Sequence, residues 1–276
     1  VWALFNMGDY PEMQERYPEQ LRYAEERGDR FSIASKTTLV GHVYHLLADD
    51  PGEAITRVDA CMRGWSQKGF HVQHWYELLA RTHVDLYRGD GVGAYERVAR
   101  VFPTAKGSLL FRVVSIRNDM LWLRARAALA AASQRFYRDE LLRLAEGDAR
   151  RVMKGGLENT PGWGHSLLAC VAHLRGQRAR ALDEARAAQR AFARAEMEGH
   201  RLAMRRREGE ITGGPAGDAI IAEADVALRA RGVRRPERCA GIVGVPTPCL
   251  PFPGTDFLKM LVDGDVERQY MLWFQE

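Results

Sequence analysis

The sequence contains no apolar run of 18 or more residues, and its cysteines never form a C-x-x-C pair. The first absence excludes a membrane-spanning helix by the usual length criterion. The second excludes a disulfide-stapled secreted domain, because four cysteines are thinly spread over 276 residues. Cys61 and Cys170 fall in expected helices, where a free thiol behaves as a small apolar residue. We therefore predict a cytoplasmic chain with no membrane partner.

The signature motifs of a protein kinase are missing as well. The chain has no H-R-D loop, no D-F-G, no V-A-I-K and no glycine-rich phosphate loop. This absence predicts a segment with no catalytic residue, no metal and no cofactor.

The charge balance argues against a nucleic-acid partner. The formal net charge is only +4, with a sequence pI of about 8.9. Nucleic-acid binding usually needs a more concentrated positive field. Nearly all of the basic charge is arginine, which we attribute to GC-rich coding bias rather than to a binding device.

A turn signal recurs at a nearly constant interval. It follows one apolar, helix-favouring run and precedes the next, at Gly8-Asp9, Asp49-Asp50, Gly89-Asp90, Gly176-Gln177 and Gly213-Gly214. The steps are 41 (8 to 49), 40 (49 to 89), 87 (89 to 176) and 37 (176 to 213), so one marker near Ala132-Ser133 is degenerate. Self-similarity at roughly 35 to 45 residues is typical of stacked helical repeats.

Each marker separates two helical segments with apolar residues at three- and four-residue steps. The expected helices cover 31–47, 51–68, 72–87, 92–101, 109–132, 138–153, 164–174, 179–195, 200–211 and 216–230. A small residue follows the turn by five positions, at Ala54, Ala94, Ala181 and Ala219, where the second helix of a pair would cross the first most closely. Glycine or proline marks the connections between pairs, at Gly28, Gly69, Pro103, Gly155-Gly156, Gly199 and Gly232. No period-two alternation indicates strands. The sequence predicts an all-α superhelical array of antiparallel helix pairs over residues 1–240.

The turn followed by alanine resembles the tetratricopeptide repeat, with a longer step than the ~34 residues of that family. The strings Gly69-Phe70-His71-Val72-Gln73-His74-Trp75, Asp85-Leu86-Tyr87-Arg88-Gly89-Asp90 and Leu123-Arg124-Ala125-Arg126-Ala127-Ala128-Leu129 are similar to the C-terminal repeat regions of large bacterial serine/threonine protein kinases. This resemblance implies a regulatory tail in signal transduction whose kinase domain precedes Val1. Since the chain opens inside a helix, we expect it to be a fragment of a longer protein.

Several motifs invite a chemical interpretation, and each has a structural alternative. Asp49-Asp50-Pro51-Gly52-Glu53 resembles an aspartate-rich magnesium motif, but Asp50 before a proline favours a helix cap. The pairs His42/His45 and His71/His74 share helix faces but lack further ligands, which favours packing over metal binding. Arg201 and Arg205–Arg207 form the densest basic stretch, which favours a solvated face paired with Glu208 and Glu210 over a phosphate contact.

Binding in tetratricopeptide-like arrays takes place on the first helix of each pair, which lines the concave face. Polar residues facing away from the core stripe are the candidates for partner binding, namely Gln73, Glu77, Arg81, Arg117 and Arg124. Charge-assisted hydrogen bonds from these side chains would recognise a partner peptide or helix.

The last residues differ in composition. Pro246, Pro248, Pro251 and Pro253 exclude a regular helix and favour extended chain, and short apolar segments follow. We expect residues 241–276 to form a proline-rich tail that includes a short apolar helix. Docking as a cap over the last helix pair is the favoured role, and an exposed partner-binding strip and an out-of-frame extension are the alternatives.

These features lead to two principal hypotheses. The first is a non-catalytic scaffold that binds a protein partner or a neighbouring kinase or ATPase domain. The second is the effector-sensing repeat region of an ATPase-type transcription regulator. An open, charged groove would favour the first, and a closed interior with converging polar groups would favour the second. An all-α enzyme built around Asp49 is a third hypothesis.

Overall fold

The computed structural model describes residues 1–134 and 137–243. Within these ranges every regular element is helical and no strand is present, which confirms the all-α prediction. The elements are α1 (Trp2–Met7), α2 (Tyr10–Glu26), α3 (Arg30–Lys36), the π-helical η1 (Thr37–Gly41), α4 (His42–Leu47), α5 (Pro51–Met62), α6 (Val72–Arg88), α7 (Gly91–Gly107), the 3₁₀ segment η2 (Leu109–Arg112), α8 (Val114–Ser133), α9 (Arg138–Met153), α10 (Thr160–Leu174), α11 (Arg178–Arg194), α12 (Glu198–Thr212), α13 (Gly214–Ala230) and α14 (Pro236–Val243).

The recurring turn has one local design. A residue with positive φ ends the first helix, as at Gly8 (77°), Asp49 (58°) and Gly89 (83°). The next residue in each case is an aspartate that caps the second helix. The Asp50 carboxylate accepts from the Glu53 backbone N–H at 2.9 Å. This cap satisfies a backbone donor that the first turn leaves without a partner.

The position of the small residue after the turn is more constant when it is counted from the first residue of the second helix than when it is counted from the turn marker. Ala54, Ala94 and Ala181 each stand three positions into their helices and are fully buried. Helix α13 begins at Gly214, so the equivalent position is Gly217, which is buried, whereas the predicted Ala219 is exposed.

Two predicted connections are wrong. Pro103 lies inside α7, where it removes one backbone donor, but burial of Phe102 and Ala105 keeps the helix going until Ser108 turns extended. Gly199 lies inside α12, and the turn before that helix is made at Glu196, with φ of 55°. The expected helix over 31–47 is also interrupted, because its middle is the π-helical η1.

Consecutive helices pack against one another along the chain, and polar side chains tie neighbouring pairs together. Arg178, at the start of α11, donates to the carbonyl of Ile211 at 3.1 Å, near the end of α12. Arg138 makes the same kind of contact from α9 to the carbonyl of Leu174 in α10. The amide of Gln134 donates to the Gly89 carbonyl at 2.8 Å. These bonds satisfy carbonyls at helix ends and fix the spacing between pairs.

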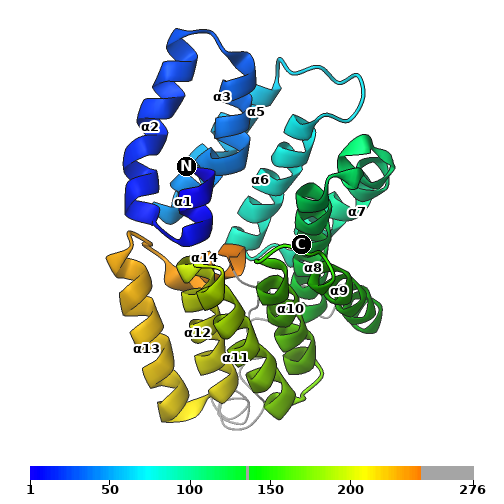
Figure 1. The fold of residues 1–276 in the computed structure, drawn as a ribbon, viewed down its shortest axis with the longest axis vertical. Helices are drawn as coiled ribbons and strands as arrows, with labels where there is room; N and C mark the ends of the chain where they lie inside the picture. Colours follow the sequence, from blue (N-terminus) through cyan, green and yellow to red (C-terminus); the bar gives the residue numbers. More distant parts are fainter. Residues whose placement is uncertain (135–136, 244–276) are drawn as a thin grey trace, which may run out of the picture.

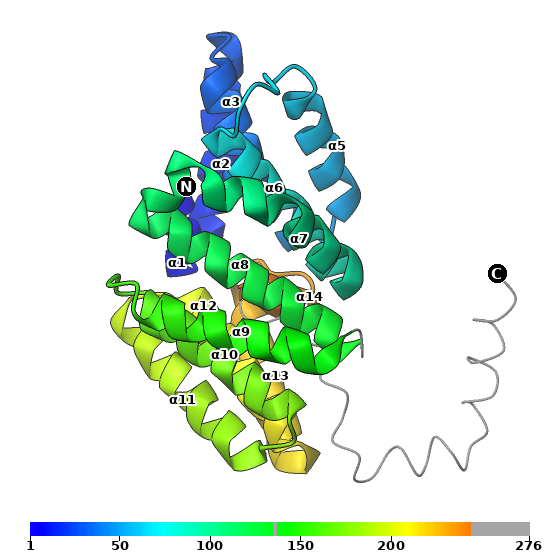
Figure 2. The same ribbon diagram turned by 90° about the vertical axis from the view of Figure 1, so that its right-hand side faces the viewer.

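The array closes on itself. Helix α1 contacts α12, and α14 contacts both α6 and α12, so the N-terminal helices meet the C-terminal part of the described chain (Figure 1). Tyr10, Met13 and Leu47 share one apolar cluster with Leu228 and Cys239. Figure 2 shows α14 between the N-terminal helices and α12–α13. A closed interior replaces the open concave groove of an extended array.

Arginines hold this closure on the α14 side. Arg234 donates from its backbone to the carbonyl of Leu47 at 3.1 Å, and its side chain donates to that of Ala48 at 3.2 Å. Arg238 contacts the carboxylate of Asp49 at 3.3 Å. Asp49 also accepts from the Tyr87 hydroxyl at 2.7 Å. The turn that opens the second repeat therefore anchors the last described helix.

Helix α8 lies at the centre of the larger apolar cluster and is buried over nearly its whole circumference from Asn118 to Ser133. It contacts α6, α7, α9 and α10. Its small residues allow close approach: a Cβ added at Gly91 would lie 2.6 Å from the carbonyl carbon of Ala130.

The predicted tail lies mostly outside the described residues. Helix α14 runs to Val243, across the expected boundary at 240, and residues 244–276 are not described. Cys61 and Cys239 are free thiols in the described part. Over 1–134 and 137–243, no helix has both the length and the apolar character that crossing a bilayer requires.

The crossing of α12 and α13 gives a test of the packing. A Cβ at Gly209 would lie 2.8 Å from the carbonyl oxygen of Gly217, which is too close for an atom that cannot move aside. We expect Gly209→Ala to lower the free energy of unfolding by about 1–3 kcal/mol. The control is Gly147→Ala in α9, where nothing lies within 4 Å of the added Cβ and stability should rise by up to about 1 kcal/mol. Urea unfolding measures both, and equal effects would contradict the packing.

Candidate functional site

One face of α8 carries a polar group into the interior. Asp119, Trp122 and Arg126 follow at steps of three and four residues, so they share a helix face. Arg126 has no exposed surface, and its guanidinium carbon lies 4.1 Å from the centre of the Trp122 ring. The indole face attracts the cation and shields it from water.

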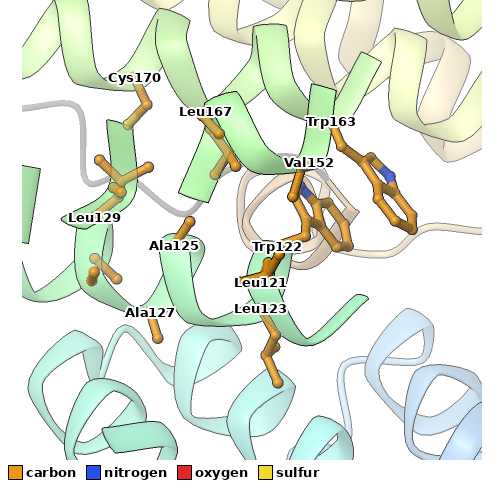
Figure 3. Close-up of a cluster of buried hydrophobic side chains, with 14 of the residues drawn as sticks. Leu121, Trp122, Leu123, Ala125, Ala127, Leu129, Val152, Trp163, Leu167 and Cys170 are labelled. Atoms are coloured by element: carbon orange, nitrogen blue, oxygen red, sulfur yellow. The ribbon is translucent and has the colours of Figure 1, made fainter. Parts of the chain in front are cut away.

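Aromatic rings from other helices surround this face. Trp163 of α10 stacks on Trp122 with ring centres 4.5 Å apart and planes at 10° (Figure 3). His200 of α12 lies 5.9 Å from Trp122 and 5.1 Å from Phe192. Phe5 of α1 approaches His200 from the other side at 6.2 Å. The closure of the array thus brings α1 and α12 to the same interior point as α8 and α10.

A pair of buried histidines completes the group. His42 Nε2 and His83 Nδ1 are 2.8 Å apart, and both side chains are almost fully buried. One of these two nitrogens must donate to the other. If both rings are neutral, the two outer nitrogens are then one donor and one acceptor, whichever tautomer forms. His42 follows directly after the π-helical η1, a distortion often found at functional sites.

We call the set formed by these residues the central cluster: His42, His83, Asp119, Trp122, Arg126, Trp163 and His200.

Burial sets the charges of the central cluster. It lowers the pKa of His42 and His200 to about 3 and that of His83 well below its usual range, and the positive charge of Arg126 acts in the same direction. Burial also lowers the pKa of Arg126 to about 9, with Asp119 opposing the change. The imidazoles are therefore neutral at pH 7, and Arg126 is a cation.

Asp119 is the acidic member of the central cluster. Burial raises the pKa of its carboxyl group to about 7, and the charge of Arg126 opposes this rise. Asp119 keeps part of its surface exposed, so its carboxyl group lies at the edge of the central cluster.

Several ring nitrogens of the central cluster are buried without a hydrogen-bond partner among the described residues. They are Nε1 of Trp122 and Trp163, Nε2 of His83, and Nδ1 of His42 and His200. The carbonyls of Thr38 and Asn6 approach His42 and His200 closely enough to influence their pKa, but without hydrogen-bond geometry. Native interiors pair the large majority of such groups, and each exception is costly. The indoles and His83 are the clearest exceptions here.

A recess of about 230 Å³ opens beside this interior. Gly89, Gly91, Ala130 and Gln134 form one wall, and Arg238 and Gly241 of α14 form part of the other. Ala130 lies one helical turn beyond Arg126 on the same face of α8. The recess therefore lies beside the part of α8 that follows Arg126, with α14 at its edge, and its lining includes no member of the central cluster defined above.

The residues predicted for partner binding do not converge on the central cluster. Gln73 is buried near the start of α6. Arg81 donates to Glu77 at 2.9 Å and to Asp59 of α5 at 2.7 Å, which links two neighbouring helices at the surface. These contacts are internal to the chain, and partner binding by these residues stays a prediction.

Arg117 and Arg124 differ from each other although both lie on α8. Arg124 binds both carboxylate oxygens of the buried Asp148 in α9 at 2.7 Å and covers the Phe102 ring at 3.8 Å. Arg117 is partly exposed and makes no ion pair with a described residue. Arg124 thus ties α8 to α7 and α9, while Arg117 keeps a free head group.

The aspartate motif that contains Asp50 and the pair His71/His74 have structural roles. Asp50 is a helix cap, as described above. His71 and His74 cap the start of α6, where the His71 backbone N–H donates to Nδ1 of His74 at 2.9 Å. Within residues 1–134 and 137–243 no three His, Cys, Asp or Glu side chains gather at a metal site.

The basic stretch of α12 makes ion pairs, as expected, but it is not a solvated face. Arg205 contacts Glu208 at 2.9 Å, and Arg206 contacts Asp225 of α13 at 2.8 Å. Arg206, Arg207 and Glu208 are all buried. These pairs join α12 to its neighbours.

One indication of the central cluster is present in the sequence, but it is too weak to identify the cluster. Asp119, Trp122 and Arg126 have helical spacing, but α8 lacks an apolar stripe that would mark an opposite polar face. The partners His83, Trp163 and His200 come from three other helices and carry no local signal at all.

Comparison with known proteins found no matching family model, and no curated protein or solved structure that matches the chain.

The pairing of Arg124 with the buried Asp148 provides a test of which arginine of α8 stabilises the fold. Replacing Arg124 with Met leaves that carboxylate with only the 3.3 Å contact from Arg151. We expect a loss of about 3 kcal/mol in the free energy of unfolding, because one partner of a buried pair is removed. Arg117→Met on the same helix should change it by less than about 0.5 kcal/mol. Chemical denaturation tests this, and similar losses in both variants would refute the assignment.

The histidines predict how stability depends on pH. The unfolded chain takes up protons near pH 6.5 at His42, His83 and His200, whereas the folded chain does not, so stability is full above this pH and falls as pH decreases toward 3. Each histidine costs about 1.4 kcal/mol for each pH unit below 6.5. Asp119 works in the opposite direction between pH 7 and 4. The net loss from pH 7.5 to 5.5 should be on the order of 2 kcal/mol.

Two variants separate these contributions in urea titrations at several pH values. His83→Gln should flatten the loss of stability on acidification, and Asp119→Asn should steepen it. The interpretation fails if both variants keep the slope of the original chain.

Proposed function

We propose that this chain is an effector-sensing helical-repeat module of the tetratricopeptide type, in which a small molecule binds at the central cluster. The observation that carries this proposal is the convergence of buried, unpartnered ring nitrogens around Arg126 inside a closed array. A scaffold that only displays a surface has no need to bury such groups, because each one weakens the fold by about 1–3 kcal/mol.

The helices around the central cluster offer a way to transmit binding. His83 is on α6 and His200 is on α12, and α14 contacts both of these helices. A ligand that draws the two side chains together would shift α6 and α12. This shift would change the packing of α14 and the Arg238–Asp49 contact. The output of the sensor would be the position or stability of α14, read by a neighbouring domain of a larger regulator.

A second function has a specific observation in its favour. An open groove of about 570 Å³ lies between α7 and α9, lined by Tyr95, Glu96, Arg100, Glu140 and Leu144. Its mixture of aromatic and charged groups suits a peptide or helix of a protein partner, as expected for a scaffold in the tail of a bacterial serine/threonine protein kinase. This groove lies on the second helices of the pairs rather than on the first.

The sensor proposal is tested by thermal unfolding with a panel of small acidic, neutral and basic compounds. A compound that binds the central cluster at about 100 times its Kd would add roughly 2.7 kcal/mol, which raises Tm by about 5 °C or more. Trp163→Phe removes the indole N–H together with one ring of the side chain and should weaken this shift. Trp65→Phe is the matched control, since Trp65 packs in a separate small apolar cluster.

If no compound raises Tm, or if both tryptophan variants respond like the original chain, the central cluster is a structural network. Binding of a partner peptide in the groove between α7 and α9 would then be the better account.

A further inference from the structure

We infer that the ligand of the central cluster is a small anion, a carboxylate or phosphate attached to a flat apolar group, and that Arg126 and the indole N–H groups of Trp122 and Trp163 bind it. This inference rests on the proposed sensor function and adds the chemical class of the effector. It follows from the charges, the donor groups and the aromatic surfaces of the cluster.

The charge of the site is positive. Arg126 is a buried cation, while His42, His83 and His200 are neutral at pH 7 because burial lowers each pKa. Asp119 is the acidic group that acts on Arg126 within the cluster, and burial raises its pKa to about 7. A negatively charged ligand would gain from Arg126 and would keep Asp119 protonated, whereas a cation would meet Arg126 in a poorly solvated interior.

The available hydrogen-bonding groups are mainly donors. An indole Nε1 can only donate, and both indole groups are buried without a partner among the described residues. An arginine has five N–H donors, so Arg126 can hold a carboxylate in addition to its contacts within the chain. The outer nitrogens of the His42–His83 pair are one donor and one acceptor, so this pair leaves the excess of donors unchanged. Such a set matches the lone pairs of a carboxylate or phosphate and leaves a basic ligand with few acceptors.

The surroundings suit a flat, apolar remainder. Arg126 covers one face of Trp122 and Trp163 covers the other, so a flat group would meet the ring edges of this stack and the Phe5 and Phe192 rings near His200. Planar groups gain from offset or edge contacts with such rings. A recess lined by Ala130 and Gln134 lies one helical turn beyond Arg126, beside α14.

The charge preference is measured by titration calorimetry with benzoate, benzamide and benzamidine, which share one shape and differ in charge. Acetate, acetamide and acetamidine form a smaller set for a narrower site. We expect the anion of at least one set to bind about 10-fold or more tightly than its neutral analogue, with no detectable binding of the cation. Wild-type protein alone is enough for this comparison, so it does not depend on the folding of a variant.

Two variants assign the effect to the cluster. Arg126→Met should reduce the affinity for the anion by 10-fold or more while changing that for the neutral analogue by less than about twofold. Arg117→Met, on the same helix and partly exposed, should leave both affinities unchanged. If Arg126→Met does not fold, Trp163→Phe provides the same test through loss of one donor, with a several-fold weaker affinity for the anion.

Asp119 gives an independent readout through pH. Its deprotonation above pH 7 places a negative charge beside the bound anion, so affinity for the anion should fall by several-fold between pH 6 and 8. Asp119→Asn should remove this dependence. A pH-independent affinity in the original chain would contradict the placement of the anion beside Asp119.

The outcomes separate the inference from the proposed function. Preferential binding of the neutral or cationic compounds, abolished by Trp163→Phe, would overturn the anion assignment and keep the sensor. Absence of binding by every compound in both sets would overturn both. Anion binding that survives Arg126→Met and Trp163→Phe unchanged would place the anion elsewhere and would also refute the inference.

Discussion

The burial of one arginine is the constraint around which the interior is organised. A guanidinium with no exposed surface loses its hydration, and only specific neighbours can offset that cost. Arg126 obtains them from the Trp122 ring, 4.1 Å from its guanidinium carbon, and from the charge of Asp119. Closure adds Phe5 of α1 to this interior, because α1 contacts α12 and Phe5 lies beside His200. Packing, charge and closure therefore meet at the same interior point.

Much of the fold was predictable because its signals are local. A left-handed residue, a capping aspartate and a small residue three positions into the helix mark the pairs, and these features act over a few residues. Helix α9 was predicted with its observed bounds. The errors have local causes too: Pro103 lies within a helix that apolar burial sustains, and α13 starts earlier relative to its marker, so that Gly217 rather than Ala219 meets α12. The resemblance to kinase-associated repeats stays a prediction.

The candidate site was much less predictable, because its members come from helices far apart in the sequence. Periodicity shows which residues share a face of one helix, but not which faces meet after the array has closed. Gln73 and Arg124 look like surface anchors by pattern, yet one is buried and the other binds Asp148. His83 and His200 have no partner in sequence, but each approaches another member of the central cluster in the structure. Closure, which no local signal encodes, converts an expected binding groove into an interior.

The most direct test follows the indole N–H signals in a ¹⁵N NMR spectrum of the full chain during titration with benzoate. Trp122→Phe and Trp163→Phe identify two of the six tryptophan signals, and Trp65→Phe identifies a reference. The account predicts that the Trp122 and Trp163 signals move downfield in proportion to bound ligand while that of Trp65 stays in place. Signals of Trp122 and Trp163 that do not respond to benzoate or acetate, while those compounds bind, would contradict it.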